Sequence, residues 1–116
     1  MTSYIYPTTA ERTEQIDEHR FLIEKQWTIH DYTLVRSQYV HAERGIGKPE
    51  WIVREAHRDL PEIVDAAPYG SDLPKFGVNW AAMGVRSVPE AREYADLIDN
   101  AARAAERFTL IAEWAE

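Results

Sequence analysis

The feature that most constrains this chain is a long C-terminal segment free of glycine and proline after a strong helix-start signal. Ser87-Val88-Pro89-Glu90 combines an N-cap serine, a proline in the first turn and a glutamate at the third helical position. The spacing predicts one α-helix over 88–115, about 42 Å long, which exceeds what a compact domain of this length needs. Its apolar residues recur at helical spacing: Ala91, Tyr94, Ala95, Ile98, Ala101, Ala102, Ala105, Phe108, Ala112 and Ala115.

The alanine-rich stripe of this helix permits the close approach of another helix. We expect its C-terminal part to project beyond the core of the domain and to pack on a second copy or on a partner protein. The alternative is that the chain's own first helices cover it. Tryptophan is enriched at binding hot spots, and the chain has four. The predicted partner-binding residues are Trp80, Phe108, Ile111 and Trp114.

The region before Gly45 predicts two further helices after an N-terminal tail, 1–7. Thr8-Thr9-Ala10-Glu11 has the spacing of a capping box. Thr28-Ile29-His30-Asp31 repeats that spacing, which places a second helix at about 29–44. A first apolar stripe at steps of three and four consists of Ile16, His19, Ile23 and Trp27.

Segment 27–40 also supports a second interpretation. It is rich in Thr, Ile, Tyr and Val, which prefer β-strands. A strand is therefore the rival of the second helix, and the helix is favoured because of the capping spacing.

The middle of the chain predicts shorter pieces. Pro49 suits the first turn of a third helix, and 62–67 reads as a short helical piece. A loop follows over 68–86, with room for one short extended segment at 76–85. The fold class predicted from these patterns is mainly α, a single compact helical domain over 1–116 with a long C-terminal helix.

Composition excludes several classes of function. The chain has no cysteine, so disulfides, thiolate catalysis and cysteine-based metal sites are excluded. No signal peptide and no apolar run of bilayer length are visible, so we expect a cytoplasmic protein without a membrane partner. The net charge is −7 and the basic residues are scattered, so direct nucleic-acid binding is not expected.

Two groups of residues are candidate metal sites. Adjacent His30 and Asp31 match the dipeptide of the all-helical HD phosphohydrolases, but helix capping by Asp31 explains the pair without chemistry. Glu93, Asp96 and Asp99 would hold Mg²⁺ only with a second acidic cluster, for which the candidates are Glu11, Glu14 and Glu18. A solvated helix face is the favoured reading. No catalytic residue, cofactor or metal is predicted.

Val78-Asn79-Trp80-Ala81-Ala82-Met83-Gly84, followed by the capped segment from Ser87 to Ala105, resembles a segment of small uncharacterised proteins of actinobacteria and their phages. The resemblance covers residues 78–105. It implies an accessory or phage-encoded protein, and it brings no activity and no functional residue with it.

The function predicted from these observations is a non-enzymatic protein-interaction or regulatory protein that binds a host or phage protein and self-associates through its last helix. If it is phage-encoded, it acts in the host cytoplasm. Two alternatives stay open: an acidic DNA mimic that inhibits a nucleic-acid enzyme, and a metal-dependent nucleotide or phosphate hydrolase.

Overall fold

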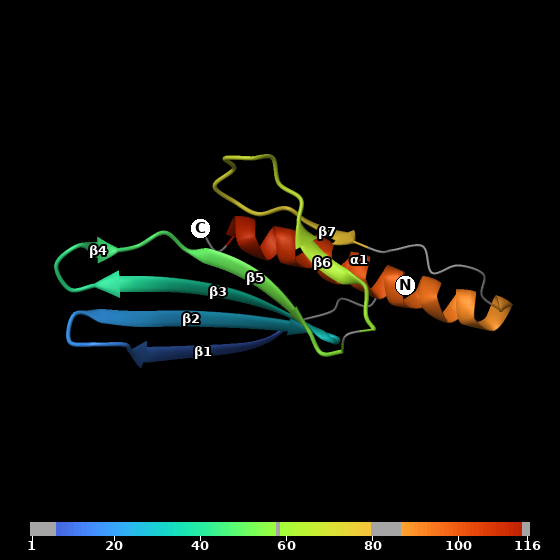
Figure 1. The fold of residues 1–116 in the computed structure, drawn as a ribbon, viewed down its shortest axis with the longest axis horizontal. Helices are drawn as coiled ribbons and strands as arrows, with labels where there is room; N and C mark the ends of the chain where they lie inside the picture. Colours follow the sequence, from blue (N-terminus) through green and yellow to red (C-terminus); the bar gives the residue numbers. More distant parts are fainter. Residues whose placement is uncertain (1–6, 58, 80–86, 115–116) are drawn as a thin grey trace. The chain divides into compact units, whose positions relative to one another are not determined.

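The computed structural model describes residues 7–57, 59–79 and 87–114, which fall into two compact units divided after Arg54. Over these residues the chain forms seven β-strands and one α-helix (Figure 1). The prediction of a mainly helical fold is therefore wrong. The sheets are antiparallel wherever their register is defined.

The first unit is a five-stranded sheet. Its strands are β1 (Thr8–Gln15), β2 (Arg20–Ile29), β3 (Tyr32–His41), β4 (Gly45–Ile46) and β5 (Glu50–Glu55), the last ending at the unit boundary. β1, β2, β3 and β4 follow one another as an antiparallel meander, and β5 also pairs with β3. β1 is thus an outer strand of the sheet (Figure 1).

A side chain stabilises the first tight turn of this meander. Between β1 and β2, the Asp17 carboxylate accepts the backbone N–H groups of His19 and Arg20, both at 2.9 Å, and its second oxygen binds the Arg20 guanidinium at 2.8 Å. These contacts, the His19 N–H first, lower the pKa of Asp17 below its ordinary value of 3.8.

The β2–β3 hairpin closes with only two residues, His30 and Asp31, between the paired Ile29 and Tyr32. His30 has a φ of 52°, the left-handed conformation that such short hairpin turns demand.

The sheet replaces each of the predicted N-terminal helices. The helix predicted from Thr8 to about Trp27 is instead β1 and β2. The helix predicted at 29–44 is the turn followed by β3, and the one predicted after Pro49 is β5. For 27–40, the strand reading was the correct one. The physical reason is cross-strand burial: Trp27 pairs with Leu34, and Ile29 pairs with Tyr32. Each of these four side chains is at least nine-tenths buried.

Aromatic stacking extends this buried face. The rings of Trp27 and Trp51 stack with centroids 6.0 Å apart, which joins β2 to β5, the strand that pairs with β3. The Lys25 ammonium lies 5.3 Å from the Trp27 ring and the Arg36 guanidinium 5.5 Å from the Trp51 ring. Because these cations lie against aromatic rings, two charges are accommodated beside an apolar core.

The second unit contains the hairpin of β6 (Glu62–Asp65) and β7 (Phe76–Asn79) and the helix α1 (Val88–Trp114). β6 lies where a short helical piece was predicted at 62–67, and that prediction is wrong. α1 matches the predicted C-terminal helix. Its cap is formed as predicted: the Ser87 hydroxyl accepts the Glu90 N–H at 3.3 Å and contacts the Glu90 carboxylate at 2.8 Å.

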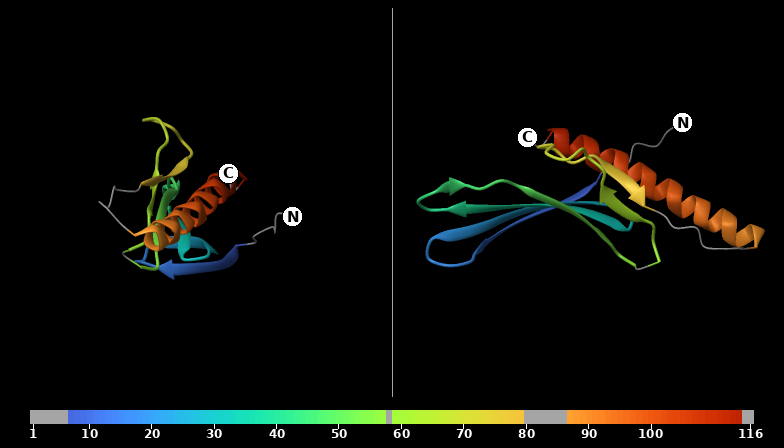
Figure 2. Two further views of the ribbon diagram at one scale, coloured as in Figure 1. Left: turned by 90° about the vertical axis from the view of Figure 1, so that its right-hand side faces the viewer. Right: turned by 45° about the horizontal axis from the view of Figure 1, so that its top comes forward.

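β7 runs beside α1 in each view of Figure 2. The buried residues of the helix are Ala101, Ala104, Ala105, Phe108, Ile111 and Ala112. The rings of Phe76 and Phe108 meet edge to face at 6.4 Å and join strand to helix.

Candidate interaction groove

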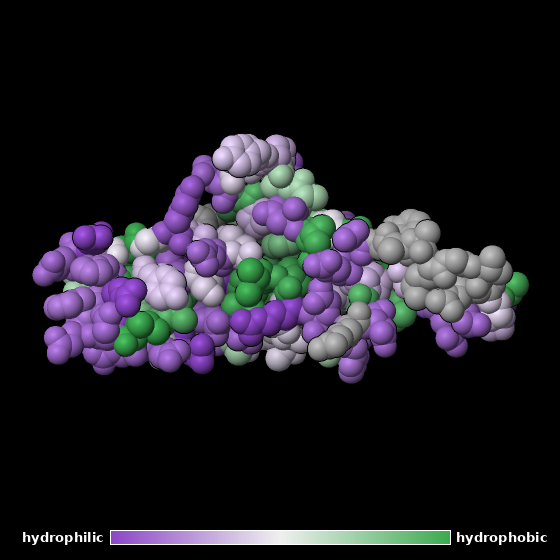
Figure 3. Space-filling view, viewed as in Figure 1, coloured by the Kyte–Doolittle hydropathy of each residue, from purple (hydrophilic) through white to green (hydrophobic). Residues whose placement is uncertain are grey.

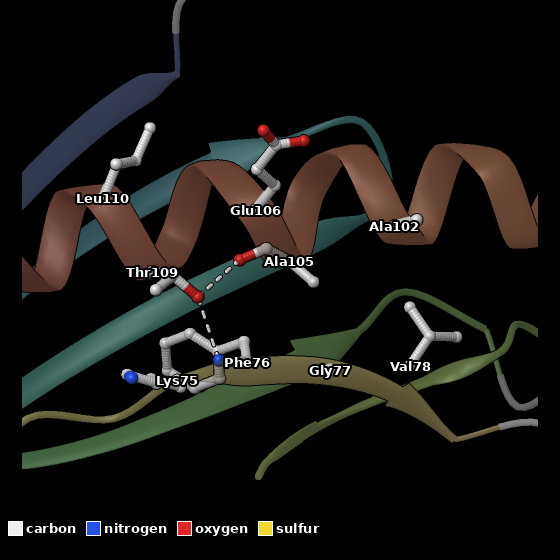
Figure 4. Close-up of a pocket in the computed structure, with 9 residues that line it drawn as sticks. All are labelled: Lys75, Phe76, Gly77, Val78, Ala102, Ala105, Glu106, Thr109 and Leu110. Atoms are coloured by element: carbon white, nitrogen blue, oxygen red, sulfur yellow. Dashed lines mark hydrogen bonds between the residues drawn. The ribbon is translucent and has the colours of Figure 1, made fainter. Parts of the chain in front are cut away.

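An apolar groove of about 550 Å³ lies between β7 and α1, and we call it the β7–α1 groove (Figure 4). Its strand side is formed by Phe76, Gly77 and Val78 with Lys75 before them. Its helix side is formed by Ala102, Ala105, Glu106, Thr109 and Leu110. Every one of these residues belongs to the second unit.

One hydrogen-bonded side chain fixes the strand against the helix. The Phe76 N–H donates to the Thr109 hydroxyl at 2.9 Å, and that hydroxyl donates to the Ala105 carbonyl at 3.0 Å (Figure 4). Because the Phe76 N–H is directed at the helix, the side of β7 that faces away from β6 borders the groove. Backbone directions alternate along a strand, so the N–H and C=O of Val78 point to this same side.

Small side chains leave the groove open. Ala102 is exposed and Ala105 is buried, and each contributes only a methyl group to the helix wall. Thr109 already uses its hydroxyl as donor and acceptor. The groove therefore offers mainly apolar contact, with charge only from the exposed Lys75 and Glu106.

The second unit carries most of the chain's negative charge. Residues 55–116 contain twelve acidic and six basic residues, a net −6 of the total −7. On α1, Asp99, Glu106 and Glu113 are exposed and recur every seven residues, so they lie on one side of the helix, about 10 Å apart along its axis. Glu106 lines the groove itself, so its helix rim is acidic.

The four predicted partner-binding residues have different positions. Phe108 is completely buried against its own unit, and Ile111 is 8% exposed. Trp114 is 67% exposed, with the Arg107 guanidinium 5.8 Å from its ring. Trp80 lies outside the described residues. Their role in partner binding stays a prediction, and of the three described residues only Trp114 presents a large surface.

The sequence patterns do not identify the groove residues. Val78 and Ala102 are far apart in the chain, and only the packing of β7 on α1 joins them. The available signal was the pair of small residues, Ala102 and Ala105, one turn apart on a capped helix. That signal shows where another element can approach but not which element does so.

The two groups of candidate metal ligands lie in separate elements. His30 and Asp31 form the hairpin turn, and Glu93, Asp96 and Asp99 are exposed on α1, where Asp99 pairs with Arg103 at 3.1 Å. Within the described ranges, no group of three or more His, Cys, Asp or Glu residues is arranged to hold a metal ion. No helix in the part of the chain that the structure describes is long and apolar enough to span a bilayer.

Comparison of the sequence with protein-family models and with curated proteins, and of the fold with solved structures, gave no match. The resemblance of residues 78–105 to actinobacterial and phage proteins stays a prediction. The function must be argued from the groove and its charges.

Proposed function

We propose that this chain is a non-enzymatic protein-binding module whose β7–α1 groove receives an apolar side chain from an extended, basic segment of a partner protein. The single observation that carries the proposal is the apolar groove between Val78 and Ala102 with a carboxylate, Glu106, on its rim. Cytoplasmic action and a phage origin, expected from the sequence, belong to the same proposal.

The chemistry of the lining supports a peptide as the occupant. The groove surface is mainly apolar, so the affinity for a peptide would come from burying one or two of the peptide's side chains. The free side of β7 adds backbone groups at Val78, which an extended segment can meet as strands do. The excess of carboxylates in this unit selects a basic segment and speeds its association.

The two alternatives have weaker support. A DNA mimic needs a dense carboxylate surface, whereas Arg103 neutralises Asp99 within the acidic row. The face in Figure 3 is mostly hydrophilic, with apolar side chains in smaller groups among the polar ones. A metal-dependent hydrolase needs clustered ligands, and within the described residues His30 and Asp31 have no third ligand beside them.

The test is a selection from a randomised peptide library displayed on phage, with the folded chain as bait. We expect enriched peptides to share an apolar residue flanked by Lys or Arg, and to bind with micromolar affinity in calorimetry. The Ala102→Phe variant fills the groove from an exposed position and should reduce binding at least tenfold. The matched control is Asn100→Phe, exposed on the opposite side of the same helix.

Charge reversal gives a second comparison. Glu106→Lys should weaken peptide binding severalfold, and the effect should shrink at high salt. Glu93→Lys changes the net charge equally but lies on another side of α1, so it should change binding much less. Selected peptides that are acidic, or that bind Ala102→Phe as well as the natural chain, would contradict the proposal.

A further inference from the structure

Among the residues of the first unit that the structure describes, no strand pairs with the outer side of β1. β1 pairs with β2 on one side, and each of its eight residues is exposed (Figure 1). It contains no proline, glycine or bulge that would blunt the edge. An edge of this kind is a template for another strand.

The hairpin geometry identifies which backbone groups face outward. The Ile16 N–H donates to the Arg20 carbonyl at 3.0 Å, so Ile16 is directed toward β2. Directions alternate along a strand, so Arg12 and Glu14 also point toward β2, whereas Glu11, Thr13 and Gln15 present their N–H and C=O groups to the open edge.

We propose that a second copy of this chain occupies this edge, with the two β1 strands antiparallel about a two-fold axis through Thr13. Such an axis is perpendicular to the sheet and pairs residues of the same face. The two Thr13 residues then exchange backbone hydrogen bonds, and Glu11 faces Gln15 of the other copy. Arg12 of each copy lies directly opposite Glu14 of the other.

Charge selects this register over its neighbours. Moving the axis to Arg12 sets two arginines opposite each other, and moving it to Glu14 or Glu11 sets two glutamates opposite each other. Like charges directly opposite in a sheet are destabilising, and opposite charges stabilise. The sequence of β1 is therefore self-complementary in the Thr13-centred register and self-repelling in the adjacent ones.

Arg12 is already held in position for this pairing. Its guanidinium binds the buried Glu24 carboxylate at 3.2 Å and contacts Glu14 of its own strand at 3.4 Å. The Arg12 side chain is still 59% exposed, so it has room for a third carboxylate, that of Glu14 in the other copy. Because Glu24 fixes it at the sheet surface, little side-chain entropy remains to be lost on association.

The size of the contact indicates a weak dimer. Residues 11–15 of the two copies would exchange about six backbone hydrogen bonds. A contact of this size falls below the standard interface area, so we expect association in the range of tens to hundreds of micromolar.

Disulfide trapping tests the Thr13-centred register. Because the chain has no cysteine, an introduced cysteine can form a disulfide only with its copy in the other chain. In the proposed dimer the two Thr13 Cα atoms lie about 5.5 Å apart, within disulfide reach. Thr13→Cys should therefore give mostly covalent dimer under mild oxidation. Thr9→Cys is on the same face of the same strand, but its two copies would lie about 26 Å apart. It is the matched control.

Sedimentation equilibrium of the chain without cysteines gives the second readout. The natural chain should associate as its concentration rises, and Glu14→Lys should weaken association at least tenfold by facing Arg12 of the other copy with a like charge. Equal cross-linking of the Thr13→Cys and Thr9→Cys variants, or a chain that stays monomeric at millimolar concentration, would overturn the proposal. If Glu14→Lys associates as well as the natural chain and Thr13→Cys gives no cross-linked dimer, the proposal is also wrong, and the chain self-associates through another surface, such as α1.

Discussion

The Thr109 hydroxyl accepts the backbone N–H of Phe76 at 2.9 Å, and this bond joins β7 to α1 across 33 residues of sequence. Thr109→Val would leave that N–H unpaired in a partly buried site, at a cost of about 1–3 kcal/mol in the free energy of unfolding. Thr109→Ser keeps the hydroxyl and should cost less than half as much. Urea unfolding measures the difference, and hydrogen exchange at the Phe76 amide locates it. A larger loss for Thr109→Ser than for Thr109→Val would show that the methyl group, and not the hydrogen bond, matters.

Truncation should destabilise the chain much more at Phe108 than at Trp114, although the sequence predicts both as partner-contact residues. Phe108 is completely buried against Phe76, so Phe108→Ala should cost about 3–5 kcal/mol of stability. Trp114 is 67% exposed and contacts Arg107, so Trp114→Ala should cost about 0.5–1 kcal/mol. Thermal unfolding of both variants is the measurement. A loss at Trp114 as large as at Phe108 would mean that the end of the helix is packed after all.

The helix could be predicted from the sequence because its start signal is local. The Ser87 hydroxyl and Glu90 satisfy each other within a single turn, and no distant partner is needed. The same spacing at Thr8–Glu11 and Thr28–Asp31 occurs in a strand and a hairpin. Capping spacing by itself therefore does not distinguish a helix from a strand or a turn.

The sheet could have been found by reading the period differently. Ile16, His19, Ile23 and Trp27 fit helical steps, but Phe21 and Leu22 do not. Reading every second residue from Phe21 to Ile29 gives one face of β2, which ends in the buried Trp27 and Ile29. The first two turns hide this pattern because the Asp17 side chain and the left-handed backbone of His30 form them, without glycine or proline. The groove depends on tertiary packing and carried no comparable local signal.

We expect the effect of a substitution at His30 to depend on how well the new residue adopts the left-handed backbone conformation, and not on whether it can bind a metal. Its φ of 52° is strained for a residue with a branched β-carbon and acceptable for asparagine. His30→Asn should therefore keep or raise stability by up to about 0.5 kcal/mol, and His30→Val should lower it by about 1–2 kcal/mol. Urea unfolding with and without Mn²⁺ checks both points. Stabilisation by Mn²⁺ that disappears in His30→Asn would instead support the metal-site alternative.

Asp17 should make the first hairpin sensitive to acid. Because its folded pKa lies below the ordinary 3.8, the unfolded chain takes up a proton at a higher pH than the folded chain does. The stabilisation is thus complete at pH values above about 4 and is lost as the pH falls through the lower folded pKa. Asp17→Asn keeps an oxygen to accept the N–H groups of His19 and Arg20 but cannot form the ion pair with Arg20. As the pH is lowered from 6 to 2, the melting temperature of Asp17→Asn should therefore fall less steeply than that of the natural chain. The carboxyl carbon of Asp17, followed by NMR, should titrate below pH 3.8; a midpoint at or above that value would contradict the role given to this turn.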